Sequence, residues 1–173
     1  MNLDGFEIER KFLIAMPPET LLEQGETSKI TQTYLLGEPG TTERVRCRRW
    51  ADRCEYTHTV KRKLSNMRRL EDETAIGEEE YKLLLKRADP SRRSIEKQRC
   101  CLTIDGLLWE LDVFPFWKDR AILELELTGE NQVFSLPDCF TLIREVTDDP
   151  RYTNAALSLE IVTETIPCVQ ERS

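Results

Sequence analysis

The residues of this chain that could do chemistry are like-charged side chains repeated at every second position. Glu124 and Glu126 alternate with leucines in 122–127, and Arg44 and Arg46 alternate with apolar residues in an earlier segment. Residues two apart in an extended strand lie on the same face. Carboxylate pairs bind hard divalent cations, whereas Arg or Lys pairs bind phosphate oxygens. The same spacing recurs in Glu7, Glu9 and Lys11, in Glu71 and Glu73, in Lys97 and Arg99, and in Glu110 and Asp112.

These charged ladders admit two interpretations. Any one of them is explained by a solvated sheet face with cross-strand ion pairs, each worth about 0.2 to 1 kcal/mol. The whole set fits that interpretation less well, because like charges two residues apart repel and the two signs are segregated by strand. A metal-bound polyphosphate would satisfy both signs at once. The set therefore favours strands whose charged faces converge on one chelated anion.

Short segments with two-residue periodicity, broken by turn signals, must position these charges. We expect a mainly β (α+β) fold with eight strands, at 6–14, 28–36, 43–50, 54–62, 68–76, 94–104, 107–114 and 121–128. A short helix is expected within 17–25 and a longer one between 77 and 89, where apolar residues recur at helical spacing. Closing the antiparallel sheet into a barrel would point every charged face into one lumen, with the helices outside.

The composition of the chain limits the kinds of molecule that it is expected to bind. The 173 residues and 20.2 kDa suit a single domain over 1–173, and no apolar run is long enough to cross a bilayer. A net charge of -7 and a pI near 5.0 argue against general affinity for nucleic acid or anionic membrane. Six cysteines with no CxxC pair, and a single histidine, argue against a zinc site and favour free thiols. We expect a cytoplasmic protein, either a monomer or a homodimer, with a small-molecule ligand.

The N-terminal segment 7–11, Glu-Ile-Glu-Arg-Lys, carries an ExExK pattern. With the motifs that follow it in order, the chain resembles the CYTH domain, the triphosphate tunnel metalloenzyme family, and in particular its compact bacterial members. The resemblance runs over about residues 6–157. The later motifs lie at 32–35, 44–46, 59–61, 71–73, 97–99, 109–114, 123–127, 145–147 and 151–154.

The resemblance implies an antiparallel eight-stranded closed barrel that binds triphosphate in its tunnel and requires Mg²⁺ or Mn²⁺. It implies metal-binding roles for Glu7, Glu9, Glu71, Glu73, Asp112, Glu124 and Glu126. It implies phosphate-binding roles for Lys11, Arg44, Arg46, Lys61, Lys97 and Arg99. It also implies that Lys11 and Tyr34 are catalytic and help to orient or deprotonate the attacking water. A ring of carboxylates would raise the pKa of a lysine, however, so water activated by a metal is the easier nucleophile.

One connection departs from the family pattern. Residues 115–121 read Pro-Phe-Trp-Lys-Asp-Arg-Ala, where many family members have a Gly-rich connection. We interpret this segment as a hairpin loop in which Phe116 and Trp117 cap the core. The alternative is that Lys118 and Arg120 extend the phosphate site.

The expected activity is metal-dependent hydrolysis of a small triphosphate, first inorganic tripolyphosphate, to pyrophosphate and phosphate. Three alternatives stay open. One is a thiamine or nucleoside triphosphatase, and another is an adenylate cyclase of the same family, which would need an adenine pocket. The last is a noncatalytic module that binds polyphosphate or nucleotide.

Overall fold

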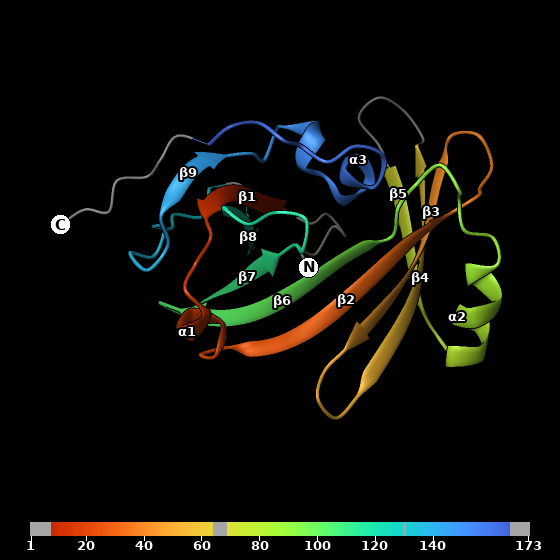
Figure 1. Cartoon of the computed structure of the whole chain (residues 1–173), viewed down its shortest axis with the longest axis horizontal. Coiled ribbons are helices and arrows are strands. Elements are labelled where there is room, and N and C mark those ends of the chain that lie inside the picture. Colours follow the sequence, from red (N-terminus) through yellow and green to blue (C-terminus); the bar gives the residue numbers. More distant parts are fainter. Residues whose placement is uncertain (1–7, 64–68, 130, 167–173) are drawn as a thin grey trace. The chain divides into compact units, whose positions relative to one another are not determined.

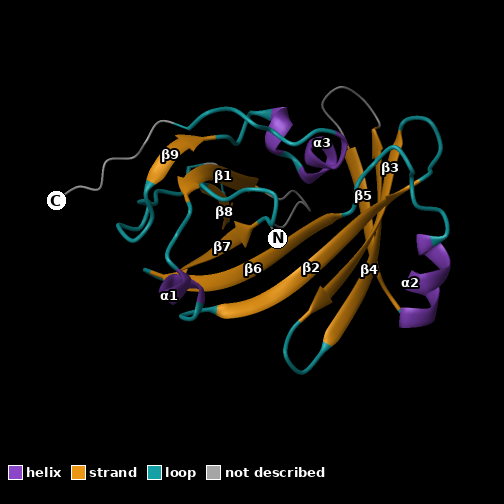
Figure 2. Cartoon of the chain, viewed as in Figure 1, coloured by secondary structure: helices purple, strands orange, loops and turns teal. Residues whose placement is uncertain are grey.

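A computed structural model describes residues 8–63, 69–129 and 131–166. Within these ranges the chain forms nine strands, three short α-helices and one 3₁₀ helix, and the strands dominate (Figure 2). Contacts divide the chain into two compact units. Unit 1 comprises Met1–Thr27, Lys97–Tyr152 and Val162–Ser173, and unit 2 comprises Ser28–Glu96 and Thr153–Ile161.

The strands of unit 1 form one antiparallel run in the order β6-β7-β8-β1-β9 (Figure 1). Their bounds are β1 (Ile8–Ala15), β6 (Ile95–Ile104), β7 (Leu107–Val113), β8 (Arg120–Leu127) and β9 (Leu142–Glu145). The hairpin between β6 and β7 turns on Asp105 and Gly106, which both have positive φ, at 52° and 76°. Positive φ at both residues is typical of a type I′ turn, whose twist matches the twist of the two strands it joins. Asp-Gly is one of the sequences that favour this turn. The short helices α1 (Glu19–Leu22) and η1 (Pro150–Tyr152) also belong to this unit.

The apolar faces of these strands form the core of unit 1. Trp109, Leu111, Leu123 and Leu125 are fully buried there, and they pack with Phe12 of β1. These residues alternate with the charged ones in sequence, so burying one face commits the other face to the charges. The position of the charged ladders therefore follows from the burial of the leucines.

Unit 2 is built on the antiparallel run β5-β4-β3-β2. Its bounds are β2 (Glu26–Leu35), β3 (Thr41–Arg49), β4 (Cys54–Lys63), β5 (Arg69–Ile76), α2 (Glu78–Leu85) and α3 (Asn154–Leu159). Tyr81 of α2 packs with Leu35, Val45 and Cys47 in the core of this unit. Figure 1 shows α2 beside β3 and β4.

The eight expected strands and both expected helices are present, but the strand count is wrong by one. The ninth strand, β9, has only four residues and pairs with β1 through a register shift between Leu13 and Ile14. Its sequence, Leu-Ile-Arg-Glu, is too short to show alternation. The helix expected up to residue 89 ends at Leu85. The amides of the next three residues bond three residues back in a tighter turn, and this segment also bonds to Tyr34 of β2 and to Leu36 just after it. Leu36 N donates to Arg87 O at 2.8 Å, and Asp89 N donates to Tyr34 O at 2.9 Å.

Two further sequence expectations concern thiols and membranes. The expected thiols are present outside any disulfide at five described positions, but only Cys47 and Cys100 are buried as expected. The full set is Cys47, Cys54, Cys100, Cys101 and Cys139. In the part of the chain that the structure describes, no helix has the length and apolar character needed to span a membrane.

Candidate functional site

Strands β1, β6, β7 and β8 bring their charged faces together in unit 1. The register places Lys11 opposite Glu124, Glu124 opposite Glu110, and Arg99 opposite Asp112. Antiparallel partners on one face have neighbouring side chains. We call this set the unit 1 cluster; it consists of Glu9, Lys11, Lys97, Arg99, Glu110, Asp112 and Glu124.

Arg99 is the hub of the unit 1 cluster. Its Nε and Nη2 donate to the two carboxylate oxygens of Asp112, each at 2.7 Å. Nη2 also donates to Glu124 at 2.6 Å, and Nη1 donates to Glu110. One planar guanidinium thus links three carboxylates on β7 and β8, which is the forked geometry that arginine provides and lysine does not.

Asp112 is fully buried and forms ion pairs with two cationic side chains. Besides Arg99, it accepts a hydrogen bond from Lys97, whose side chain is 2% exposed. Burying a carboxylate is costly unless it is paired and hydrogen-bonded, and here both conditions are met. Burial also lowers the pKa of Lys97, while the Asp112 carboxylate opposes that shift.

Lys11 bridges Glu9 and Glu124. Its Nζ lies 3.0 Å from Glu124 Oε1 and 3.3 Å from Glu9 Oε1. Burial acts to lower the pKa of Lys11, but Glu124 and Glu9 outweigh it, and the pKa is raised. Lys11 is therefore protonated at neutral pH and is not poised to accept a proton. The expectation that nearby carboxylates would raise the pKa of a lysine is met at this residue.

Glu9 and Glu124 are two carboxylates that share Lys11 as a partner. Burial and then the Glu124 charge raise the pKa of Glu9. Burial also acts to raise the pKa of Glu124, but Lys97, Lys11 and Arg99 outweigh it and the pKa is lowered. A hard cation prefers such oxygen donors. Among the described residues, however, no group of three or more His, Cys, Asp or Glu side chains is gathered as a metal site.

Unit 2 has a cluster of its own on β2, β3, β4 and β5. Gln32 lies opposite Arg46, Tyr34 opposite Arg44, Arg44 opposite Thr59, and Thr59 opposite Glu73. Glu73 accepts a hydrogen bond from the Thr59 hydroxyl at 2.7 Å and lies 3.6 Å from Arg44 Nη2. We call this set the unit 2 cluster; it consists of Gln32, Tyr34, Arg44, Arg46, Thr59, Lys61 and Glu73.

Tyr34 is buried at the end of the unit 2 cluster. Its hydroxyl accepts a hydrogen bond from Gln32 Nε2 at 2.8 Å, and the Arg92 guanidinium lies 5.1 Å from its ring centre. Burial raises the pKa of Tyr34 despite the nearby Arg44. The phenol therefore keeps its proton at neutral pH, so it is suited to donating a hydrogen bond rather than to acting as a base.

The predicted site residues divide between the two clusters. The structure brings Glu9, Lys11, Lys97, Arg99, Asp112 and Glu124 together in unit 1, and Tyr34, Arg44, Arg46 and Glu73 together in unit 2. Lys61 is half-buried on the same face of β4 as Thr59, and Glu126 is exposed opposite Glu9. Glu7 and the side chain of Glu71 lie outside the described residues.

Sequence reasoning left three residues out of the site. Glu110 bonds to Arg99, Gln32 bonds to three residues of its cluster, and Thr59 bonds to Glu73. Glu110 alternates with apolar residues in the sequence, and this alternation already placed it on the charged face of its strand. Gln32 and Thr59 carry no charge, so a search for like-charged pairs could not find them.

The aromatic residues of the 115–121 connection pack together as expected, but the segment is not simply a solvated loop, since Trp117 and Arg120 are buried. Trp117 is buried, and its ring packs against Phe114, Phe116 and Tyr152. Arg120 is also buried, and it donates to Asp119 and to the backbone oxygen of Glu164. Its guanidinium is thus committed to the fold of this region, and Lys118 is exposed.

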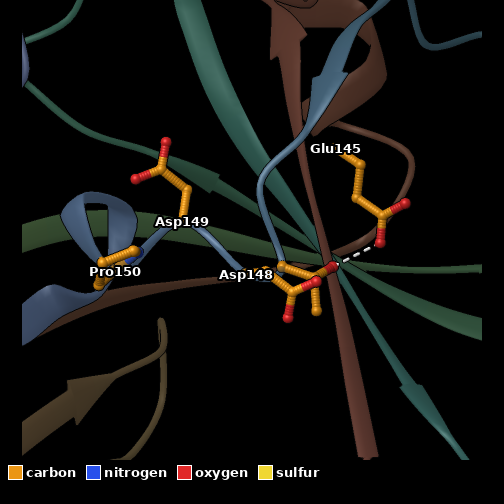
Figure 3. A pocket seen from close by; sticks show the side chains of 5 residues that line it. Glu145, Asp148, Asp149 and Pro150 are labelled. Atoms are coloured by element: carbon orange, nitrogen blue, oxygen red, sulfur yellow. Dashed lines mark hydrogen bonds between the residues drawn. The ribbon is translucent and has the colours of Figure 1, made fainter.

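A shallow surface depression of about 460 Å³ lies elsewhere in unit 1, along the loop after β9 (Figure 3). It is lined by Glu145, Thr147, Asp148, Asp149 and Pro150. Thr147 donates to Glu145 at 2.6 Å. Arg10 bonds to Glu145, and Arg151 bonds to Asp149. Glu145 and Asp149 therefore each pair with an arginine, and neither belongs to the unit 1 cluster.

The fold and the clusters define a class of protein: an antiparallel β protein whose strands carry alternating apolar and charged faces, with carboxylates and cations in register. No protein-family model matches the chain. A curated inorganic triphosphatase from Acetivibrio thermocellus is 34% identical over 154 residues, which cover 88% of this chain and 93% of the relative. One from Nitrosomonas europaea is 34% identical over 159 residues, covering 90% of this chain and 98% of the relative.

A solved structure agrees with these relatives. The crystal structure of the inorganic triphosphatase NE1496 matches with a TM-score of 0.58 and 33% identity, covering 90% of this chain and 96% of that one. A putative adenylate cyclase from Bacillus halodurans matches at a TM-score of 0.50 and 18% identity, which shows likeness of fold alone. The chain belongs to the inorganic triphosphatase family.

Proposed function

We propose that this chain hydrolyses inorganic tripolyphosphate to pyrophosphate and phosphate in a reaction that requires Mg²⁺ or Mn²⁺. The observation that carries the proposal is the 34% identity to two inorganic triphosphatases over nearly their whole length. The two clusters of in-register charge support it, because they supply donors for phosphate oxygens and carboxylates for a cation.

We further propose that the antiparallel strands close into a tunnel of the CYTH type that binds the triphosphate. The support is chemical. The unit 1 cluster is rich in carboxylates, and the unit 2 cluster presents two neighbouring arginines. A chelated polyanion needs both kinds of partner. The burial of the alternating apolar residues in each unit leaves these charges on the opposite strand faces.

The proposed phosphate-binding residues are Lys11, Arg44, Arg46, Lys61, Lys97 and Arg99. The proposed metal-binding residues are Glu7, Glu9, Glu71, Glu73, Asp112, Glu124 and Glu126. Within that set we assign the leading role to Glu9 and Glu124, whose carboxylates share Lys11 as a partner. Asp112 already serves Lys97 and Arg99, so its main task is to hold these two cations.

The proposed reaction has no covalent enzyme intermediate. Water attacks the terminal phosphorus, the bond to the bridging oxygen breaks, and pyrophosphate leaves. The proton that the water gives up passes to a phosphate oxygen of the products or to solvent. The transition state is loose and anionic, so positioning and charge neutralisation carry most of the catalysis. When bound, the divalent ion supplies a water of lowered pKa and neutralises phosphate charge.

Lys11 and Tyr34 act in this scheme as protonated groups. The raised pKa of each keeps its proton in place at neutral pH. Lys11 stabilises the charge on the terminal phosphate, and the Tyr34 hydroxyl orients a phosphate oxygen by donating a hydrogen bond. Neither residue needs to remove a proton from water.

The test is to incubate the purified protein with tripolyphosphate, ATP or thiamine triphosphate, each with Mg²⁺ or Mn²⁺. Phosphate, pyrophosphate and cyclic AMP are then measured. We expect tripolyphosphate to be the best substrate and to yield equal amounts of phosphate and pyrophosphate. Release of cyclic AMP from ATP would identify a cyclase, and tight binding without turnover would identify a binding module. Either result would overturn the proposal.

A further inference from the structure

Gln32 is a fully buried polar residue at the centre of the unit 2 cluster. Its Oε1 accepts one hydrogen bond from Arg44 Nη1 and one from Arg46 Nη2, both at 3.3 Å. Its Nε2 donates to the Tyr34 hydroxyl at 2.8 Å. All three hydrogen bonds of this amide therefore go to residues of the candidate site.

The two arginines need such a partner. Arg44 and Arg46 lie two residues apart on one face of β3, so their guanidiniums repel each other. A single oxygen that accepts from both holds the two guanidiniums side by side. Because the oxygen must face the two guanidiniums, the amide orientation is fixed and its NH₂ group faces Tyr34.

A neutral amide suits this task better than a carboxylate. A carboxylate at this position would bind the same guanidiniums more strongly, but it would neutralise part of their charge and repel phosphate. The amide orients both arginines without adding a second carboxylate beside Glu73, which already lies 3.6 Å from Arg44 Nη2. It also occupies an acceptor site on the Tyr34 hydroxyl, which directs the phenol's own proton toward another acceptor.

We propose that Gln32 is a positioning residue that fixes the spacing of Arg44 and Arg46 and the direction of the Tyr34 hydroxyl for binding a phosphate group. This inference rests on the proposed triphosphatase function. Gln32 acts through its three partners and need not touch the reacting atoms.

The first test compares Gln32→Met with Thr33→Val in steady-state kinetics on tripolyphosphate with Mg²⁺. Methionine has nearly the same length and no amide. Thr33 is the adjacent buried residue on the opposite face of β2, and its hydroxyl bonds to Ser94 at 2.8 Å, so it is a matched control. We expect Gln32→Met to raise KM about tenfold, the effect of losing hydrogen bonds that involve charged groups, with a smaller change in kcat. Thr33→Val should lower the melting temperature while KM stays within about twofold. Equal KM values for the two variants would overturn the inference.

The second test asks whether Gln32 acts through the arginines. In a double-mutant cycle, Gln32→Met is combined with Arg44→Ala and Arg46→Ala together. We expect the effect of Gln32→Met on KM to fall from about tenfold to about threefold or less once both arginines are absent, because only the hydrogen bond to Tyr34 then remains. A merely structural role would give the same factor in both backgrounds, and that result would contradict the proposal.

Gln32→Glu keeps the inference testable if the Met variant does not fold. The new carboxylate can pair with both guanidiniums, so the fold should be retained, as measured by circular dichroism and thermal unfolding. We expect KM to rise more than in any folded Gln32→Met protein, because the carboxylate repels phosphate. Wild-type KM in Gln32→Glu would overturn the inference. Absence of tripolyphosphate turnover in the wild-type protein would instead overturn the proposed function itself.

Discussion

At the scale of single residues, the unit 1 cluster depends on a buried carboxylate that two cations share. Asp112 is fully buried, Lys97 is almost so, and Arg99 reaches from Asp112 to Glu124 and Glu110. The identity and spacing of these residues were visible in the sequence. The sequence did not show which carboxylates would bond to Arg99, since those contacts depend on the register of three strands.

Removing the charge of Asp112 should destabilise the protein. Asp112→Asn keeps the shape but leaves Lys97 and Arg99 with one fewer buried negative charge. We expect a loss of about 3 kcal/mol in the free energy of unfolding, measured by urea denaturation. The control is Glu126→Gln on the exposed end of β8, which should change that free energy by less than about 0.5 kcal/mol. Equal effects would show that Asp112 does not hold the two cations.

At the scale of elements, alternation alone located the eight longer strands. It succeeded because one face of each strand is buried, so its apolar residues recur at every second position. It missed β9, which is too short to show a period, and it extended the longer helix beyond Leu85. There the backbone of Asp89 bonds to Tyr34 of β2 and that of Arg87 bonds to Leu36 just after it, tertiary contacts that local spacing does not encode.

The hairpin between β6 and β7 offers a test of its turn. Gly106 has φ 76° and open space where a side chain would project. We expect Gly106→Ala to lower the free energy of unfolding by about 1 kcal/mol, because an L-residue is strained at positive φ. Gly129→Ala is the control, since that position also has open space but its φ lies outside the left-handed region. A stabilising effect of Gly106→Ala would contradict the assigned turn.

The turn that leads into η1 predicts a pH dependence. Hydrogen bonds from Arg151 hold the pKa of Asp149 at about 2, below its ordinary value of 3.8. A lowered folded-state pKa stabilises the protein above the unfolded-state pKa, and this contribution is lost as the pH falls. We expect the stability difference between wild type and Asp149→Asn to be constant above about pH 5 and to shrink between about pH 4 and 2. A difference independent of pH in thermal unfolding would contradict this assignment.

At the scale of the whole molecule, the charged faces separate into two clusters, one in each compact unit. The sequence indicated the faces and most of their charged members. Gln32 and Thr59 lie within the motifs at 32–35 and 59–61, but only the hydrogen bonds of the structure give each of them a place in the unit 2 cluster. The organisation of 1–173 as one functional domain stays a prediction, as does the closed tunnel.

The proposed function assigns Glu124 to binding the metal and Arg46 to binding a phosphate group of tripolyphosphate. The most direct measurement is steady-state kinetics on tripolyphosphate for Glu124→Gln and Arg46→Ala over a range of Mg²⁺ concentrations. We predict that Glu124→Gln lowers kcat about 100-fold and raises the Mg²⁺ requirement, and that Arg46→Ala mainly raises KM, by about tenfold. Wild-type kcat and KM in both variants would contradict the account.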